Sequence, residues 1–176
     1  MLIIDTHTHV AVKSLMSRTV SAIDREMPIL PVKDLIEQMD AHHVAHAVLV
    51  QWGSCWDHHY VAQCLTDYPD RFAVAAHLDV QRHDAMEVLD DMVKRHGFTG
   101  VRYTATDRSP GENPMQMWEA ASELGAVISV SAGNAMQFAD GLEPVLKHLP
   151  DLKIRIEHLG RCPYGTGFAD TQFDRV

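Results

Sequence analysis

Short apolar runs alternate with longer amphipathic stretches along almost the whole chain. The apolar runs are typical of buried β-strands, and the stretches between them repeat apolar residues at helical spacing. In the segment 32–43, for example, Leu35, Ile36 and Met39 fall on one helical face. The pattern predicts strands over residues 2–9, 45–52, 71–80, 98–104, 126–132 and 152–160, and helices over residues 32–43, 57–68, 82–97, 113–125 and 141–149.

This alternation indicates an α/β fold, in which successive strands pair in parallel through right-handed crossovers. Two architectures fit, an open doubly wound sheet and a (β/α)8 barrel. No glycine-rich fingerprint follows the first strand, which disfavours the dinucleotide-binding form of the open sheet. A complete barrel takes about 250 residues, whereas this chain has 176. We therefore expect one domain, residues 1–176, of the (β/α)8 TIM-barrel type, incomplete in this chain at about six βα units.

Composition narrows the class of partner and the compartment. The chain is 46% hydrophobic, which is typical of a globular domain, and no apolar stretch approaches the length of a membrane span. A formal net charge of -9 disfavours nucleic acid as a partner. There is no signal-peptide pattern, and the three cysteines are widely spaced, as in proteins of a reducing compartment. We expect a cytoplasmic protein with no membrane or nucleic-acid partner.

Polar residues lie at the expected carboxyl ends of all six strands, where barrels of this type place their function. A ring of polar groups at equivalent positions is what the mouth of a barrel needs. These residues are His7, His9, Gln51, His77, Asp79, Arg102, Ser129, Ser131 and His158.

The stretch "DTHTH" at residues 5–9 carries the first candidate metal ligands. A strand period of two puts His7 and His9 on one face. Two converging imidazoles can bind a divalent cation at about 2.0–2.1 Å. Alone, the pattern also fits two histidines hydrogen-bonded in polar surroundings, and the position at the end of the first strand favours function.

Two further candidates, His158 and Arg102, end the sixth and fourth strands. His158 follows Ile154 and Ile156 on one expected face, and it could act as base, acid or ligand. Arg102 could hold a substrate carboxylate through its planar fork, or form a structural ion pair with an acid such as Asp107. Arg155 and Glu157 fall on the opposite face of the sixth strand, which indicates a solvated flank or local pairing.

Five pieces of the sequence resemble the amidohydrolase superfamily, specifically its amidohydrolase-related (amidohydrolase 2) group: "IIDTHTHV", "AVLVQ", "YPDRFAVAAHLD", "GFTGVRYT" and "LKIRIEHLGR". The resemblance runs from residue 2 to about residue 162. It implies a (β/α)8 barrel whose members hydrolyse lactones and related esters or amides, or decarboxylate aromatic and unsaturated acids. It also implies that His7 and His9 are metal ligands for zinc or manganese. By the same resemblance, His158 is a catalytic base or substrate-polarising group and Arg102 contacts substrate.

The sequence departs from the family pattern in two places. The fifth-strand histidine ligand of the family should fall at or near Ser131, and the family's eighth-strand aspartate lies beyond the end of this chain. The chemistry uses both, because the metal lowers the pKa of its water and the carboxylate takes the proton. The expected cofactor is thus a divalent metal, or none if the site is degenerate.

Three interpretations remain open. The first is a hydrolase that acts on a small carboxylated lactone, ester or amide, with Arg102 holding the carboxylate. The second is a non-oxidative decarboxylase of the same family, which Ser131 disfavours because decarboxylation needs a well-bound metal. The third is an inactive or incomplete barrel that needs a partner, since open strand edges promote pairing with another chain. The same edges predict a homo-oligomer.

Overall fold

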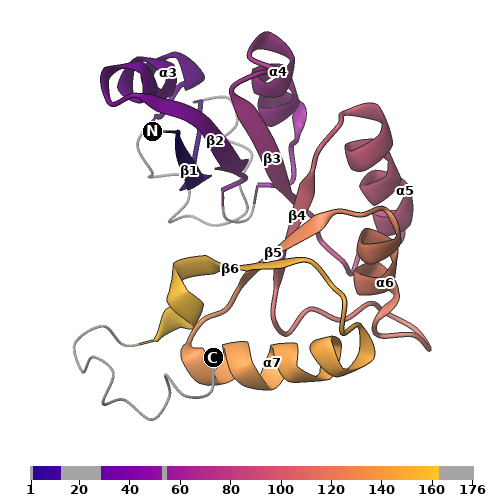
Figure 1. Cartoon of the computed structure of the whole chain (residues 1–176). Helices are drawn as coiled ribbons and strands as arrows, with labels where there is room; N and C mark the ends of the chain where they lie inside the picture. Colours follow the sequence, from indigo (N-terminus) through magenta and orange to yellow (C-terminus); the bar gives the residue numbers. More distant parts are fainter. Residues whose placement is uncertain (1, 13–28, 53–54, 163–176) are drawn as a thin grey trace. The chain divides into compact units, whose positions relative to one another are not determined.

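The computed structural model describes residues 2–12, 29–52 and 55–162. Strands and helices alternate along the described chain, as Figure 1 shows, and this confirms the predicted α/β class. The strands are β1 (Ile3–Thr8), β2 (Val44–Val50), β3 (Phe72–His77), β4 (Gly100–Thr104), β5 (Val127–Ser131) and β6 (Ile154–Ile156). The helices are α3 (Val32–Ala41), α4 (His59–Asp67), α5 (Ala85–Asp90), α6 (Gln116–Glu123) and α7 (Ala135–His148), with a π-helical turn η1 (Asp91–Arg95) and a 3-10 segment η2 (Glu157–Arg161).

The six strands are hydrogen-bonded in sequence order, from β1 to β6. The pairs β1–β2, β2–β3 and β5–β6 are parallel. The described residues thus contain six strands and the five α-helices that connect them, which confirms the predicted incomplete (β/α)8 TIM-barrel type. The described residues form two compact units, one within Met1–His77 and Met92–Gly100 and the other within Leu78–Asp91 and Val101–Val176. A single domain over residues 1–176 stays a prediction.

In the first unit, α3 packs on β2 and α4 packs on β3. Side chains such as Leu49 and Val74 are fully buried between these elements. The start of α3 has no side-chain cap of its own, and the Tyr60 hydroxyl of α4 accepts a hydrogen bond from the Val32 N–H at 2.9 Å. This contact satisfies one of the N–H groups that every helix start leaves without an intrahelical partner.

In the second unit, β4 alternates between two faces. Val101 and Tyr103 are fully buried, and the Tyr103 ring packs edge-on against the buried Trp118 of α6, with ring centroids 5.2 Å apart. The Trp118 indole N–H donates to the Asp107 carbonyl at 2.9 Å, so its polar edge is satisfied. Because side chains alternate along a strand, Arg102 lies on the face opposite Tyr103 and Trp118.

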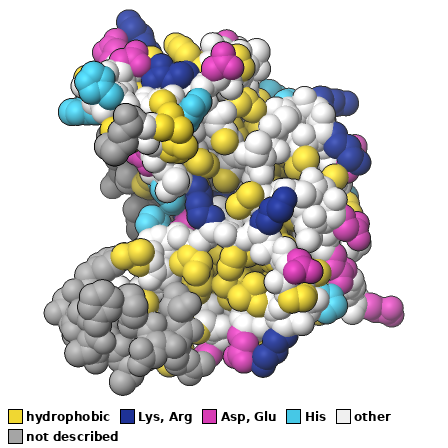
Figure 2. Space-filling model, in the orientation of Figure 1, with side chains coloured by type: hydrophobic (Ala, Val, Ile, Leu, Met, Phe, Trp, Pro, Cys, Tyr) yellow, Lys and Arg dark blue, Asp and Glu magenta, His cyan; other side chains and the backbone are white. Residues whose placement is uncertain are grey.

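Helix α7 is longer than the predicted helix over residues 141–149, and it begins six residues earlier. The Asn134 side chain accepts a hydrogen bond from the Gln137 N–H at 2.9 Å, which is the pattern of an N-cap. Phe138, Leu142 and Val145 are buried on one face of the helix. In Figure 2, hydrophobic side chains gather over the region between β6 and α7. The cap and this apolar face together extend the helix across Gly141.

Gly141 lies against the turn that follows β4. Arg108 donates to the Gly141 carbonyl at 2.6 Å and to the Ala105 carbonyl at 3.1 Å, so one guanidinium joins the turn to the helix. A Cβ atom on Gly141 would lie 2.6 Å from the Ala105 carbonyl oxygen and 2.7 Å from its carbonyl carbon. This close approach of two backbones requires glycine.

We expect Gly141→Ala to lower the free energy of unfolding by about 1–3 kcal/mol, because backbone atoms of Ala105 cannot move aside. The same change at an unobstructed position inside a helix would raise it by about 0.5–1 kcal/mol. Urea denaturation followed by circular dichroism measures the difference. The control is Gly133→Ala, whose Cβ would meet only the flexible end of the Gln137 side chain, so its effect should stay within about 0.5 kcal/mol. Equal stability of the two variants would contradict the expectation.

Candidate functional site

The histidine pair His7 and His9 lies at the carboxyl end of β1. Side chains of this segment form hydrogen bonds with the backbone of β2. The Thr8 hydroxyl donates to the Val48 carbonyl at 3.1 Å, and the His9 ring Nδ1 lies 2.7 Å from the Val50 carbonyl oxygen. The Asp5 carboxylate accepts a hydrogen bond from the His7 backbone N–H at 3.0 Å. The strand period of two predicts that the rings share a face, and their centroids are 4.8 Å apart.

The hydrogen bond to Val50 determines how His9 presents its ring. A carbonyl only accepts, so Nδ1 of His9 carries the proton and Nε2 presents its lone pair when the ring is neutral. Nε2 of His7 lies 3.2 Å from Nε2 of His9. Two imidazole nitrogens bound to one metal ion at about 2.0–2.1 Å are about 2.9 Å apart at a right angle and about 3.4 Å apart at a tetrahedral angle. The same distance is that of a hydrogen bond between the two rings, in which Nε2 of His7 donates to Nε2 of His9. The observed distance also falls between the two metal-bound values, so the pair could serve as two ligands of a divalent metal once His7 loses that proton.

Aromatic and amide side chains at the ends of β2 and β3 support this end of the unit. The Trp52 ring packs edge-on against His9, with centroids 4.5 Å apart. Gln51 is buried, and its amide donates to the Asp57 carbonyl at 2.8 Å and accepts from the His77 N–H at 2.9 Å. The amide nitrogen and the amide oxygen of Gln51 both bind backbone groups, so these contacts of Gln51 hold the ends of the strands in place.

In the second unit, Arg102 forms an ion pair with Glu157. Nε of Arg102 lies 3.0 and 3.2 Å from the two carboxylate oxygens, and Nη2 lies 2.7 Å from Oε2. The Glu157 side chain is fully buried and that of Arg102 is 11% exposed. The structural ion pair offered as one alternative for Arg102 is thus confirmed, but its partner is Glu157 and not Asp107, the acid named as an example. Asp107 accepts hydrogen bonds from the backbone N–H and the hydroxyl of Thr104.

Ser129 and Arg155 complete a group that we call the Arg–Glu cluster: Arg102, Ser129, Arg155 and Glu157. The Ser129 hydroxyl donates to Oε1 of Glu157 at 2.6 Å and accepts from Nη2 of Arg155 at 2.5 Å. The same Nη2 lies 3.9 Å from Oε1 of Glu157. Ser129 and Arg155 are paired in the β5–β6 register, which places them side by side. Of the two alternatives for the charges of the sixth strand, the structure shows local pairing.

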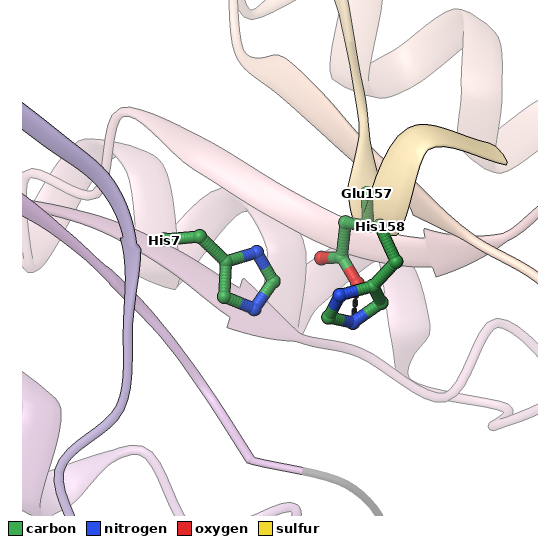
Figure 3. A group of neighbouring side chains, drawn as sticks. All are labelled: His7, Glu157 and His158. Carbon is green, nitrogen blue, oxygen red and sulfur yellow. Dashed lines mark ion pairs between the residues drawn. The ribbon is translucent and has the colours of Figure 1, made fainter. Parts of the chain in front are cut away.

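The sixth strand is shorter than the predicted strand over residues 152–160. β6 ends at Ile156, and His158, Leu159, Gly160 and Arg161 have positive φ values of 51°, 51°, 66° and 60°. The alternation of the strand therefore stops before His158, and His158 does not continue the face of Ile156. The turn brings Nε2 of His158 to 3.8 Å from Oε2 of its neighbour Glu157 (Figure 3), a contact that is an ion pair only when the imidazole is protonated.

The surroundings of His158 favour its neutral form. Burial lowers the pKa of His158 below its ordinary value of 6.5, and the positive charges of Arg161 and Arg102 lower it further. The Glu157 carboxylate opposes this shift without reversing it. A neutral imidazole at pH 7 can accept a proton, which is the property of a general base.

Ser131 occupies the position where the resemblance implies a fifth-strand histidine. Its hydroxyl donates to the Tyr103 carbonyl at 3.5 Å. The sequence interpretation did not identify Glu157 as the residue on which the cluster depends. The available signal was the pair of opposite charges two residues apart on the sixth strand, together with an arginine on the fourth.

Comparisons with solved structures show a shared fold. The chain is similar to a probable 2-pyrone-4,6-dicarboxylic acid hydrolase from Acinetobacter baumannii with citric acid bound, at 21% identity and a TM-score of 0.79 over 99% of this chain and 65% of that one. It is also similar to a 5-carboxyvanillate decarboxylase from Novosphingobium aromaticivorans with bound manganese, at 14% identity and a TM-score of 0.70 over 91% and 66% of the two chains.

A third similar structure is an amidohydrolase from Burkholderia multivorans with bound zinc, at 14% identity and a TM-score of 0.66 over 92% of this chain and 59% of that one. The chain thus spans 59–66% of the length of these three proteins. None of the curated proteins compared with the chain matches it. None of the described helices is both long and apolar enough to cross a membrane.

The family model described as Amidohydrolase matches residues 4–173, which is nearly the whole chain. The protein therefore belongs to this amidohydrolase family.

Proposed function

We propose that the chain carries the active-site residues of a hydrolase that acts on a small carboxylated lactone, or on a related ester or amide. In this proposal His7 and His9 hold a divalent metal, Arg102 binds a substrate carboxylate, and His158 accepts a proton. The observation that carries the proposal is the 3.2 Å separation of the two Nε2 atoms, with the His9 tautomer set by Val50. Family membership and the likeness to a probable lactone hydrolase support the reaction class.

The metal would be zinc or manganese, the ions found in two of the similar structures. When bound, it supplies Lewis acidity, which polarises a carbonyl oxygen and lowers the pKa of water. The chain's own contribution at this point is the hydrogen bond to Val50, which orients the His9 ring and places the proton of its neutral form on Nδ1. In metal-binding histidines, the ring nitrogen that does not bind the metal usually donates a hydrogen bond that orients the ring. In His9 this is the bond from Nδ1 to the Val50 carbonyl.

Arg102 and His158 would act on the substrate. A guanidinium can bind a carboxylate through its Nε–Nη2 edge or through its Nη1–Nη2 edge. Glu157 binds the first edge of Arg102, and in this proposal a substrate carboxylate would bind the guanidinium outside that edge. His158, held neutral by burial and by neighbouring cations, would take the proton from the water that attacks the substrate carbonyl.

A non-oxidative decarboxylase is the second candidate, because the chain is similar in fold to a 5-carboxyvanillate decarboxylase. Decarboxylation needs a well-bound metal, and Ser131 in place of a histidine ligand disfavours it. A third candidate is an incomplete barrel that acts only with a partner. We also propose a homo-oligomer, supported by exposed apolar side chains at Ile4 and Ile156 of the first and sixth strands. A cytoplasmic location is supported by three free cysteines.

We expect the purified chain, stripped with a chelator and then dialysed against Zn²⁺ or Mn²⁺, to retain about one ion per chain. The double variant His7→Ala/His9→Ala should retain none above background, because both imidazole ligands are lost. The matched control is His42→Ala/His43→Ala, which removes an exposed histidine pair and should bind metal as the original chain does. Elemental analysis measures the content. Equal metal in the two double variants would place the ion elsewhere.

We expect hydrolysis of 2-pyrone-4,6-dicarboxylate, followed by loss of its ultraviolet absorbance, to show a KM about tenfold or more higher in Arg102→Gln, because a charge-assisted contact to the carboxylate is lost. Arg82→Gln is the control, since Arg82 pairs with Asp84 on the surface of the same unit. Turnover of 5-carboxyvanillate with release of carbon dioxide, without lactone hydrolysis, would favour the decarboxylase instead. No turnover of either compound would contradict both activities.

We expect His158 to titrate below 6.5 in histidine NMR spectra. As pH falls through this lowered pKa, His158 gains a proton and hydrolysis should decline. Arg161→Gln should move both the titration and the acid limb of the rate profile upward, because a cation that disfavours protonation is removed. Lys147→Gln removes an exposed cation of the same unit and should leave both unchanged. A titration of His158 above 6.5 would rule it out as a neutral base.

A further inference from the structure

The Arg–Glu cluster holds two cations around one anion. Arg102 and Arg155 are always protonated in proteins, and the buried carboxylate of Glu157 contacts both. Glu157 alone would neutralise Arg102, whereas Arg155 restores a net positive charge. The exposed fractions of the side chains are 11% for Arg102, 22% for Arg155 and 0% for Glu157, so solvent screens these charges poorly.

The contacts also fix geometry. Glu157 grips Arg102 by Nε and Nη2, and this two-point contact sets the plane of the guanidinium. Ser129 links the remaining members, since its hydroxyl donates to Glu157 and accepts from Arg155. A long arginine side chain without such contacts would lose rotamer freedom when it binds a ligand, which weakens binding. In the cluster, Arg102 is already ordered.

We propose that Glu157 is a positioning residue that orients Arg102 toward a substrate carboxylate, and that Arg155, linked through Ser129, keeps the cluster positive enough to attract that carboxylate. This inference rests on the proposed function, in which Arg102 binds the carboxylate. It adds three residues to substrate recognition and narrows the substrate class to compounds that place an anionic group at Arg102. Glu157 itself does not contact the substrate.

Glu157 could have an alternative role, for which the substitution Glu157→Gln would change the affinity for anions in the opposite direction. If it only offset the positive charges, Glu157→Gln would raise the local charge by one unit and tighten the binding of anions. If it positions Arg102, the same variant weakens their binding, because glutamine cannot accept two charge-assisted hydrogen bonds from the guanidinium. The sign of the change in anion affinity therefore separates the two roles.

The test uses the metal-stripped 176-residue chain and two planar probes, isophthalate and its uncharged analogue isophthalamide. NMR titration at constant ionic strength gives their dissociation constants. We expect the original chain to prefer isophthalate, and Glu157→Gln to bind isophthalate about tenfold more weakly. Arg155→Gln should also weaken it. Binding of isophthalamide should not change with either substitution.

The charge-matched control is Asp40→Asn. Asp40 accepts a hydrogen bond from Arg71 at 2.8 Å in the first unit, so this variant also removes the carboxylate partner of an arginine and raises the net charge by one. It should bind isophthalate as the original chain does. Ser129→Ala keeps every charge of the cluster. It replaces Glu157→Gln as the test variant if circular dichroism shows that Glu157→Gln is unfolded. It should weaken isophthalate binding several-fold.

Two failures can be told apart. If the original chain does not prefer isophthalate over isophthalamide, the proposed carboxylate recognition by Arg102 fails, and this inference fails with it. If the original chain shows the preference but Glu157→Gln binds isophthalate equally or more tightly, only the positioning role is overturned. If Glu157→Gln is unfolded, the test uses Ser129→Ala. Isophthalate binding by Ser129→Ala that equals that of the original chain would then overturn the positioning role of Glu157.

Discussion

The buried carboxylate of Glu157 is the constraint on which the second unit depends. An ionised carboxylate that is removed from water costs several kcal/mol unless charges and hydrogen bonds replace its hydration. The structure supplies these from three strands: Arg102 on β4, Ser129 on β5 and Arg155 on β6. A slip of one residue in any of these strands would turn the partner side chain to the other face and leave the charge unmatched. The carboxylate therefore specifies strand register as well as local charge.

The histidine pair of the first unit depends on a different kind of constraint. His7 and His9 come from a single strand, and their separation follows from the strand period and from one hydrogen bond to the Val50 carbonyl. The spacing of the two histidines is local and needs no buried charge, whereas the orientation of His9 comes from the neighbouring strand. This difference explains why "DTHTH" is readable from the sequence as a candidate metal site, whereas the Arg–Glu cluster is not.

The alternation of strands and helices could be predicted from the sequence because apolar period and length are local properties of the chain. The beginning of α7 could not, since Asn134 caps a helix whose packing on the unit decides its length. The ion-pair partner of Arg102 could not be predicted from the sequence either. Asp107 is close in sequence and Glu157 is 55 residues away, and only the sheet brings Glu157 to Arg102. His158 shows the same limit, because positive φ values after Ile156 end the alternation on which its expected face was based.

Ion pairing and substrate binding by Arg102 were two alternatives at the level of sequence. The structure shows the ion pair with Glu157, and binding of a substrate carboxylate by the same arginine is our proposal. A guanidinium has two edges that can each accept a carboxylate, and Glu157 uses one of them. A structural ion pair on one edge reduces the freedom of the whole guanidinium, so in our proposal the contact that satisfies a buried acid would also orient the arginine for a ligand. Glu157 offsets the positive charge of Arg102, and the second cation, Arg155, leaves the cluster with a net positive charge. Under this proposal stability and substrate recognition draw on the same buried acid, and a single substitution at Glu157 would affect both.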